Sequence, residues 1–99
     1  MEHVQLATEN QLARLHELNI GANFFANHLY YWGDVHAEYT VGPYEVKRME
    51  PMRSAVNHGV RFGVHSDDPI TEVNPLFSAW CACNRKSGIS GKVYGEDQC

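Results

Sequence analysis

Histidine and aspartate side chains follow three short, mainly apolar segments of this sequence, and they are the residues best suited to do chemistry. His3 lies in Glu2-His3-Val4-Gln5, His28 follows residues 20–26, and His65 and Asp67 follow residues 60–64. Imidazole and carboxylate groups bind divalent metals and transfer protons. The six histidines of the chain also invite a metal-site hypothesis, although their number alone does not decide it.

The segments around these residues predict alternating strands and helices. Residues 8–19 predict a helix, because Thr8 and Gln11 fit a capping box and leucines recur at helical spacing at positions 12, 15 and 18. Residues 20–26 and 60–64 predict strands, the first of them buried on both faces. Helical sequence resumes after Pro43 and again after Pro51 and ends at Gly59, with Met52, Ala55 and Val56 available for packing.

Three further segments complete this interpretation. Residues 27–41 are aromatic-rich without a clean period, which predicts a long ordered loop. Asn74 and Pro75 predict the capped start of a helix that has Arg85 and Lys86 in its last turn and ends at Gly88. Residues 89–99 are polar and predict a loop or a frayed end.

This order predicts an α/β fold with parallel strands, since such alternation requires crossover connections. The carboxyl ends of parallel strands converge on one rim, where α/β enzymes place their active sites. We therefore expect His3, His28, His65 and Asp67 to meet at that rim.

Composition narrows the class of protein. With 43% hydrophobic and 20% charged residues in 99, the chain has the composition of one small globular domain or of a piece of a larger one. Eight basic against twelve acidic residues argue against a nucleic-acid partner. We expect no membrane partner and no signal peptide, since no long apolar run is present. The three cysteines are an odd number and two of them lie too close for an ordinary disulfide, so we expect no disulfide framework and a cytoplasmic location.

Several motifs together resemble a known family. They are Glu2-His3-Val4-Gln5, the run Phe24-Phe25-Ala26-Asn27-His28-Leu29-Tyr30-Tyr31-Trp32-Gly33-Asp34, His65-Ser66-Asp67-Asp68-Pro69 and Asn74-Pro75-Leu76. In order and spacing they are similar to the late part of metal-dependent amidohydrolases of the amidohydrolase 3 branch, which includes enzymes like N-substituted formamide deformylase. The resemblance covers nearly all of the chain.

The resemblance implies a partial (β/α)8 TIM-type barrel, with residues 1–99 as one segment that holds about three βα units, the sixth to the eighth. It implies a hydrolase of amide or formamide C–N bonds in small molecules, with one or two divalent metals, usually zinc. His3 would be a metal-site histidine, and Asp67 would be both a metal ligand and the catalytic proton acceptor. His28, Trp32, Asp34 and His65 would line the site.

The sequence also departs from the family pattern. Family barrels carry a His-x-His pair on the first strand and further ligands on the fourth and fifth strands, and none of these is present here. Asp68 stands where relatives usually have a small residue. A complete barrel needs about 250 residues, so we expect this chain to be inactive alone. By itself it would bind no metal, or bind one only weakly. The alternative is a free-standing, non-catalytic α/β protein that self-associates or binds a partner.

Structural roles compete with these functional ones. His3 could be a frayed terminal residue, Asp67 a turn residue and His65 a strand cap. The Tyr30-Tyr31-Trp32 cluster could cover a substrate pocket or pack a loop. His16 and His58 fall in helical sequence and are expected at the surface, while His36 allows no interpretation. Cys81 and Cys83 point about 200° apart on a helix and are expected not to chelate one ion.

Overall fold

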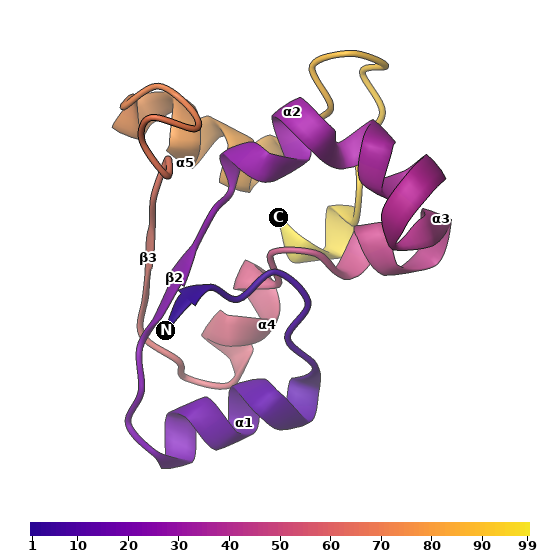
Figure 1. Cartoon of the computed structure of the whole chain (residues 1–99). Helices are drawn as coiled ribbons and strands as arrows, with labels where there is room; N and C mark the ends of the chain where they lie inside the picture. Colours follow the sequence, from indigo (N-terminus) through magenta and orange to yellow (C-terminus); the bar gives the residue numbers. More distant parts are fainter.

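Three short strands lie parallel in the order β1 (Glu2–His3), β2 (Ala22–Phe24) and β3 (Phe62–Val64). Phe24 is aligned with His3 on one side and with Val64 on the other, so the strands end at one edge. The computed structural model, which describes residues 1–99, thus has an α/β fold with a parallel sheet, as the sequence predicts (Figure 1).

Helices occupy the connections between the strands and the segment after β3. They are α1 (Glu9–Glu17), α2 (Asn27–Val35), the π-helix η1 (His36–Thr40), α3 (Gly42–Glu45), the 3-10 helix η2 (Val46–Arg48), α4 (Met52–Asn57), α5 (Pro75–Asn84) and the 3-10 helix η3 (Glu96–Gln98). No helix of this set is long and apolar enough to cross a bilayer.

The main core joins β2 to α1, α4 and α5. Its ten buried residues are Val4, Leu12, Leu15, Ala22, Phe24, Ala26, Met52, Ala55, Val60 and Cys81. Side chains alternate along a strand, so Ala22 and Phe24 enter this core while Asn23 points to the other face and donates to Glu2 Oε2 at 2.9 Å. One face of the sheet is therefore apolar and covered by helices, and the other carries polar side chains.

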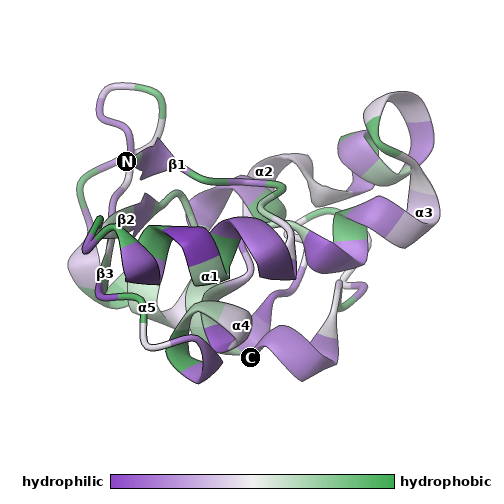
Figure 2. Cartoon of the chain, turned by 90° about the horizontal axis from the view of Figure 1, so that it is seen from below, coloured by the Kyte–Doolittle hydropathy of each residue, from purple (hydrophilic) through white to green (hydrophobic).

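Helix α1 matches its sequence signals. The side chain of Thr8 accepts from the backbone N–H of Gln11, whose own side chain accepts from the N–H of Thr8, so the capping box is confirmed. Leu12 and Leu15 are buried, and each contributes about 1.5–3 kcal/mol of apolar burial. Leu18, beyond the helix end, is 52% exposed. Figure 2 shows α1 in front of the sheet with mainly hydrophilic residues along it.

The prediction of a long loop over residues 27–41 is wrong. The structure has α2 followed directly by η1. Leu29 and Gly33 are buried on one side of α2, but aromatic residues around the rest of the helix hide the periodicity that would have revealed it. A second, smaller apolar cluster of Leu29, Val46, Met49 and Tyr94 holds this segment in place.

The boundary of α5 also differs from the expectation. Asn74 accepts from the N–H of Phe77 as the predicted N-cap, but the helix ends at Asn84 rather than Gly88. Arg85 takes a left-handed conformation (φ 51°) and is fully buried. Its guanidinium donates to the carbonyl oxygens of Tyr94 (2.7 Å), Met49 (2.6 Å) and Glu50 (3.0 Å). Arg85, expected in the last turn of the helix, is thus a buried anchor just beyond the helix end.

The segment after α5 is mainly a loop, one of the two expected alternatives, but it is held by contacts and is not frayed. Lys86 forms an antiparallel bridge with Val93, and Tyr94 is buried. The carbonyl oxygen of Cys99 accepts from the guanidinium of Arg53 at 2.6 and 2.9 Å. Long-range contacts therefore fix a segment whose composition alone gave no such signal.

Two smaller expectations are corrected at exposed positions. Ile20 precedes β2 and is 40% exposed, so the strand is shorter than residues 20–26. Val56 is 53% exposed on α4 and does not pack with Met52 and Ala55. The β3 strand is exposed at all three of its residues, which leaves an open edge on the sheet.

Candidate metal centre

His3 ends β1 at the carboxyl edge of the sheet. His3 and Val4 both have positive φ angles, 63° and 52°, so the chain turns sharply after the strand. Non-glycine residues rarely adopt this conformation. Those that do are often found at functional sites, where the surrounding structure holds them in place. The ring of His3 packs edge-on against Phe25, with the ring centroids 5.7 Å apart.

His65 directly follows β3, and its backbone N–H donates to the carbonyl of Phe24 at 2.9 Å. Its ring centroid lies 5.0 Å from that of His3 and 5.4 Å from that of Phe25. Nε2 of His65 is buried and has no hydrogen-bond partner, and Glu2 Oε2 lies 3.9 Å away. A buried nitrogen without a partner is uncommon, because its lost hydration is not replaced.

Asp67 lies in the turn after β3 and has a left-handed φ of 56°. Its carbonyl oxygen accepts from the N–H of Ile70 at 2.7 Å. Asn27 Nδ2 donates to Thr71 Oγ1 at 2.9 Å, and Thr71 donates onward to the carbonyl of Ser66. These bonds attach the turn to the start of α2 and fix the position of Asp67.

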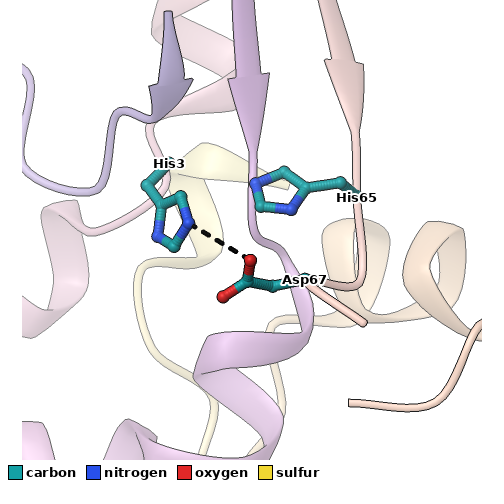
Figure 3. A group of neighbouring side chains, drawn as sticks. All are labelled: His3, His65 and Asp67. Atoms are coloured by element: carbon teal, nitrogen blue, oxygen red, sulfur yellow. Dashed lines mark ion pairs between the residues drawn. The ribbon is translucent and has the colours of Figure 1, made fainter. Parts of the chain in front are cut away.

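The three side chains converge, as Figure 3 shows. Each offers one ligand atom, and these atoms all lie within 4.8 Å of one another. Nε2 of His3 is 3.6 Å from Oδ1 of Asp67. Two imidazole nitrogens and one carboxylate oxygen are a donor set that zinc accepts, and three protein ligands leave a position for water. The side chains of His3 and Asp67 are 42% and 37% exposed, so solvent reaches the group.

Comparison with known proteins identifies the family of this chain. The model of the Amidohydrolase family matches residues 1–99, the whole of the sequence. The chain belongs to the amidohydrolase family. No curated protein and no solved structure matches it.

The amidohydrolase family is generally metal-dependent, and the residues present fit a metal ion. The fit rests on the convergence of three ligand atoms and on the unpartnered Nε2 of His65. Among the residues predicted for the site, His3, His65 and Asp67 are brought together at the end of the sheet. His65, expected only to line the site, is a member of the group itself.

His28 and Trp32, both on α2, lie beside this group. The ring of His28 stacks on Phe25 with centroids 5.1 Å apart and planes 13° apart, and Trp32 packs edge-on against His28 at 5.1 Å. Phe25 therefore contacts His28 as well as His3 and His65. Burial, together with the neighbouring His36 and His3, lowers the pKa of His28 to about 4.

Asp34 of the amidohydrolase chain contacts a different part of the molecule. Its carboxylate accepts from the hydroxyl groups of Ser87, Ser90 (2.6 Å) and Tyr94, and from the N–H of Ser90. Burial opposes ionisation of Asp34, but these hydrogen bonds outweigh it and hold the pKa well below its usual range. Its observed contacts thus attach the 87–94 segment to α2.

The sequence interpretation assigned no role to three residues around the group. Phe25 packs against the histidines, Gln5 contacts Nδ1 of His28, and His36 faces His28. An apolar residue inside a strand and a histidine inside an apparent loop give no chemical signal, so the sequence offered no means to select them. Cys81 is buried and Cys83 is exposed, and both are free, which agrees with side chains that point apart on the helix.

Proposed function

We propose that this chain supplies part of the metal site of a (β/α)8-type amidohydrolase that cleaves amide or formamide C–N bonds of small molecules. The observation that carries the proposal is the convergence of His3, His65 and Asp67 at the carboxyl ends of β1 and β3. Parallel β/α proteins place catalytic groups at this end of the sheet. In such a barrel the polar face that carries Asn23 and Glu2 would face the inside.

His3 and His65 would hold the metal through imidazole nitrogens, with Asp67 as the carboxylate ligand. A bound divalent ion, for which zinc is the best match to this donor set, would supply a Lewis acid that lowers the pKa of a water molecule toward neutrality. The second carboxylate oxygen of Asp67 would serve as the proton acceptor for the attacking water and would return the proton to the leaving nitrogen.

His28 and Trp32 would border the substrate. Both lie on α2 beside Phe25, close to the group but outside it. His28 is neutral at pH 7 because burial lowers the pKa of its ring.

The test begins with the size of the protein in its own cells, measured by immunoblot against the purified chain of 11.2 kDa. Protein purified from those cells at its natural size is then loaded with zinc and assayed against N-substituted formamides and N-acyl amines. We expect release of the amine, and loss of release in an Asp67→Asn variant. Full activity of that variant would overturn the assignment, as would a zinc-loaded protein that cleaves no substrate of either class.

A second candidate function is self-association without catalysis. The observation that favours it is the open edge at β3, where Phe62 and Val64 are 38% and 36% exposed. An exposed apolar edge strand pairs readily with another strand. Sedimentation of the purified chain distinguishes the candidates, because this function requires a stable oligomer that Asp67→Asn leaves unchanged.

A further inference from the structure

We infer that His28 and His36 form a second binding site for a divalent cation of the zinc type. This site shares no ligand with the group of His3, His65 and Asp67 and does not depend on the function proposed above. Nε2 of His28 lies 3.3 Å from Nε2 of His36. The two ring planes meet at 70° with their centroids 4.6 Å apart, so the two nitrogens face each other.

The hydrogen bonds of Thr40 determine which nitrogen of His36 carries its proton. The hydroxyl of Thr40 lies 3.3 Å from the carbonyl oxygen of His36, to which it donates, and 2.7 Å from Nδ1 of the same residue. With the hydroxyl proton on that carbonyl, Oγ1 accepts from Nδ1. In that arrangement Nδ1 of His36 carries the proton, and its Nε2 presents a free lone pair toward His28.

His28 is supported in a similar way. Nε2 of the Gln5 amide faces Nδ1 of His28, and a half-turn of that amide would place the carbonyl oxygen there instead. With the oxygen toward the ring, Nδ1 is the protonated nitrogen and Nε2 becomes a ligand. Metal-binding histidines typically donate their other N–H to a fixed acceptor in this manner. Burial lowers the pKa of both rings, which keeps them in the neutral form that metals bind.

The separation of the two nitrogens fits one shared ion. Zinc–nitrogen bonds of about 2.0–2.1 Å at a tetrahedral angle place two ligand nitrogens about 3.3–3.4 Å apart. The observed 3.3 Å agrees with this value and is long for an N–H···N hydrogen bond. Two protein ligands leave two positions, which water or a polar group of a ligand would fill.

Secondary structure explains why these two residues meet. His28 is the second residue of α2 and His36 is the first of the π-helix that continues it. The ring of His28 is held by stacking on Phe25 and by the edge of Trp32. The pair therefore lies beside the candidate centre, and π-turns are frequent at functional sites.

The test is a zinc titration of the whole chain with its histidines labelled with 15N, because each imidazole then reports separately. We expect the Nε2 signals of His28 and His36 to shift together and to saturate at the same zinc concentration. In a His36→Gln variant the shift at His28 should disappear while the responses of His3 and His65 are kept. His16→Gln, on the exposed side of α1, is the control and should change neither response.

Thr40→Val provides a variant that keeps both imidazoles. It removes the acceptor for Nδ1 of His36 at an exposed position, and we expect the affinity of the pair for zinc to fall about tenfold. The inference is overturned if zinc shifts His3 and His65 but neither member of the pair, or if His28 responds equally in the His36→Gln variant. If zinc shifts the signals of His28 and His36 but not those of His3 and His65, the proposed function is contradicted and the second site is supported.

Discussion

Nε2 of His3, at the end of β1, lies 3.6 Å from Oδ1 of Asp67, in the turn after β3. The two residues come from the two outer strands of the sheet, and β2 lies between those strands. Their approach therefore depends on the parallel arrangement of all three strands, which brings the carboxyl ends to one edge. The predictions below test what this relationship does.

Asp67→Asn should remove most zinc binding at the candidate centre. The amide that replaces the carboxylate is neutral and is a poor zinc ligand compared with an anionic oxygen. The change should appear in calorimetric titration of the purified chain with zinc. Asp68→Asn is the matched control, because Asp68 is the exposed neighbour and should retain wild-type binding. Equal losses in both variants would assign the effect to overall charge.

His65→Gln should weaken zinc binding at the same centre by about tenfold or more, since one of three ligands is lost. The sequence alone leaves His65 as a lining residue or a strand cap, and in those roles the variant would bind zinc normally. His58→Gln, which changes a histidine paired with Glu9 away from the group, serves as the control. Circular dichroism should show that both variants keep the fold.

Glu50 should make the folded state less stable as the pH rises. Burial raises the pKa of Glu50 to about 8, although the N–H of Phe25 and the charge of Arg85 act in the opposite direction. An unfolded chain returns Glu50 to its ordinary value of 4.5, so the folded state binds more protons between about pH 4.5 and 8. The free energy of unfolding should therefore fall across this window.

Glu50→Gln should remove that dependence, because the glutamine keeps an acceptor for Phe25 and does not ionise. Urea unfolding at several pH values should show the variant gaining on the wild type from pH 5 to pH 8, by on the order of 2–4 kcal/mol in all. Other acidic groups affect both proteins alike, so the difference between the two curves is the relevant quantity. Parallel curves would contradict the prediction.

Arg85→Met should destabilise the fold by about 3–5 kcal/mol. The buried guanidinium donates to carbonyl oxygens of Met49, Glu50 and Tyr94, and methionine would leave them without partners. Lys86→Met changes the exposed neighbour and should alter the free energy of unfolding little. Urea denaturation measures both, and equal stability of the two variants would show that Arg85 does not anchor the fold.

Val64→Lys should reduce self-association if the open edge of β3 pairs with a second copy of the chain. A lysine on an edge strand discourages a further strand from pairing there. Sedimentation velocity over a range of concentrations should show a smaller species for this variant than for the wild type. Val73→Lys, at another exposed apolar position, is the control. A wild-type chain that is monomeric at every concentration would contradict this alternative.

The sequence by itself determined the features that depend on local chemistry. The capping box of Thr8 and Gln11 and the Asn74 cap satisfy backbone groups within one turn, so their residue types reveal them directly. The alternation of strands and helices predicted a parallel sheet, and a parallel sheet places His3 and Asp67 at the same edge. The sequence therefore indicated this edge without any distance being known.

Only the tertiary structure decided the features that depend on distant partners. Helix α2 is buried by a cluster that includes Tyr94, and Arg85 is held by four carbonyl groups from other segments. His36 acquires a role because the π-helix turns it toward His28. Packing of this kind overrides local propensity, because a buried contact stabilises two segments that are far apart in the sequence, and the residues of either segment alone do not reveal it.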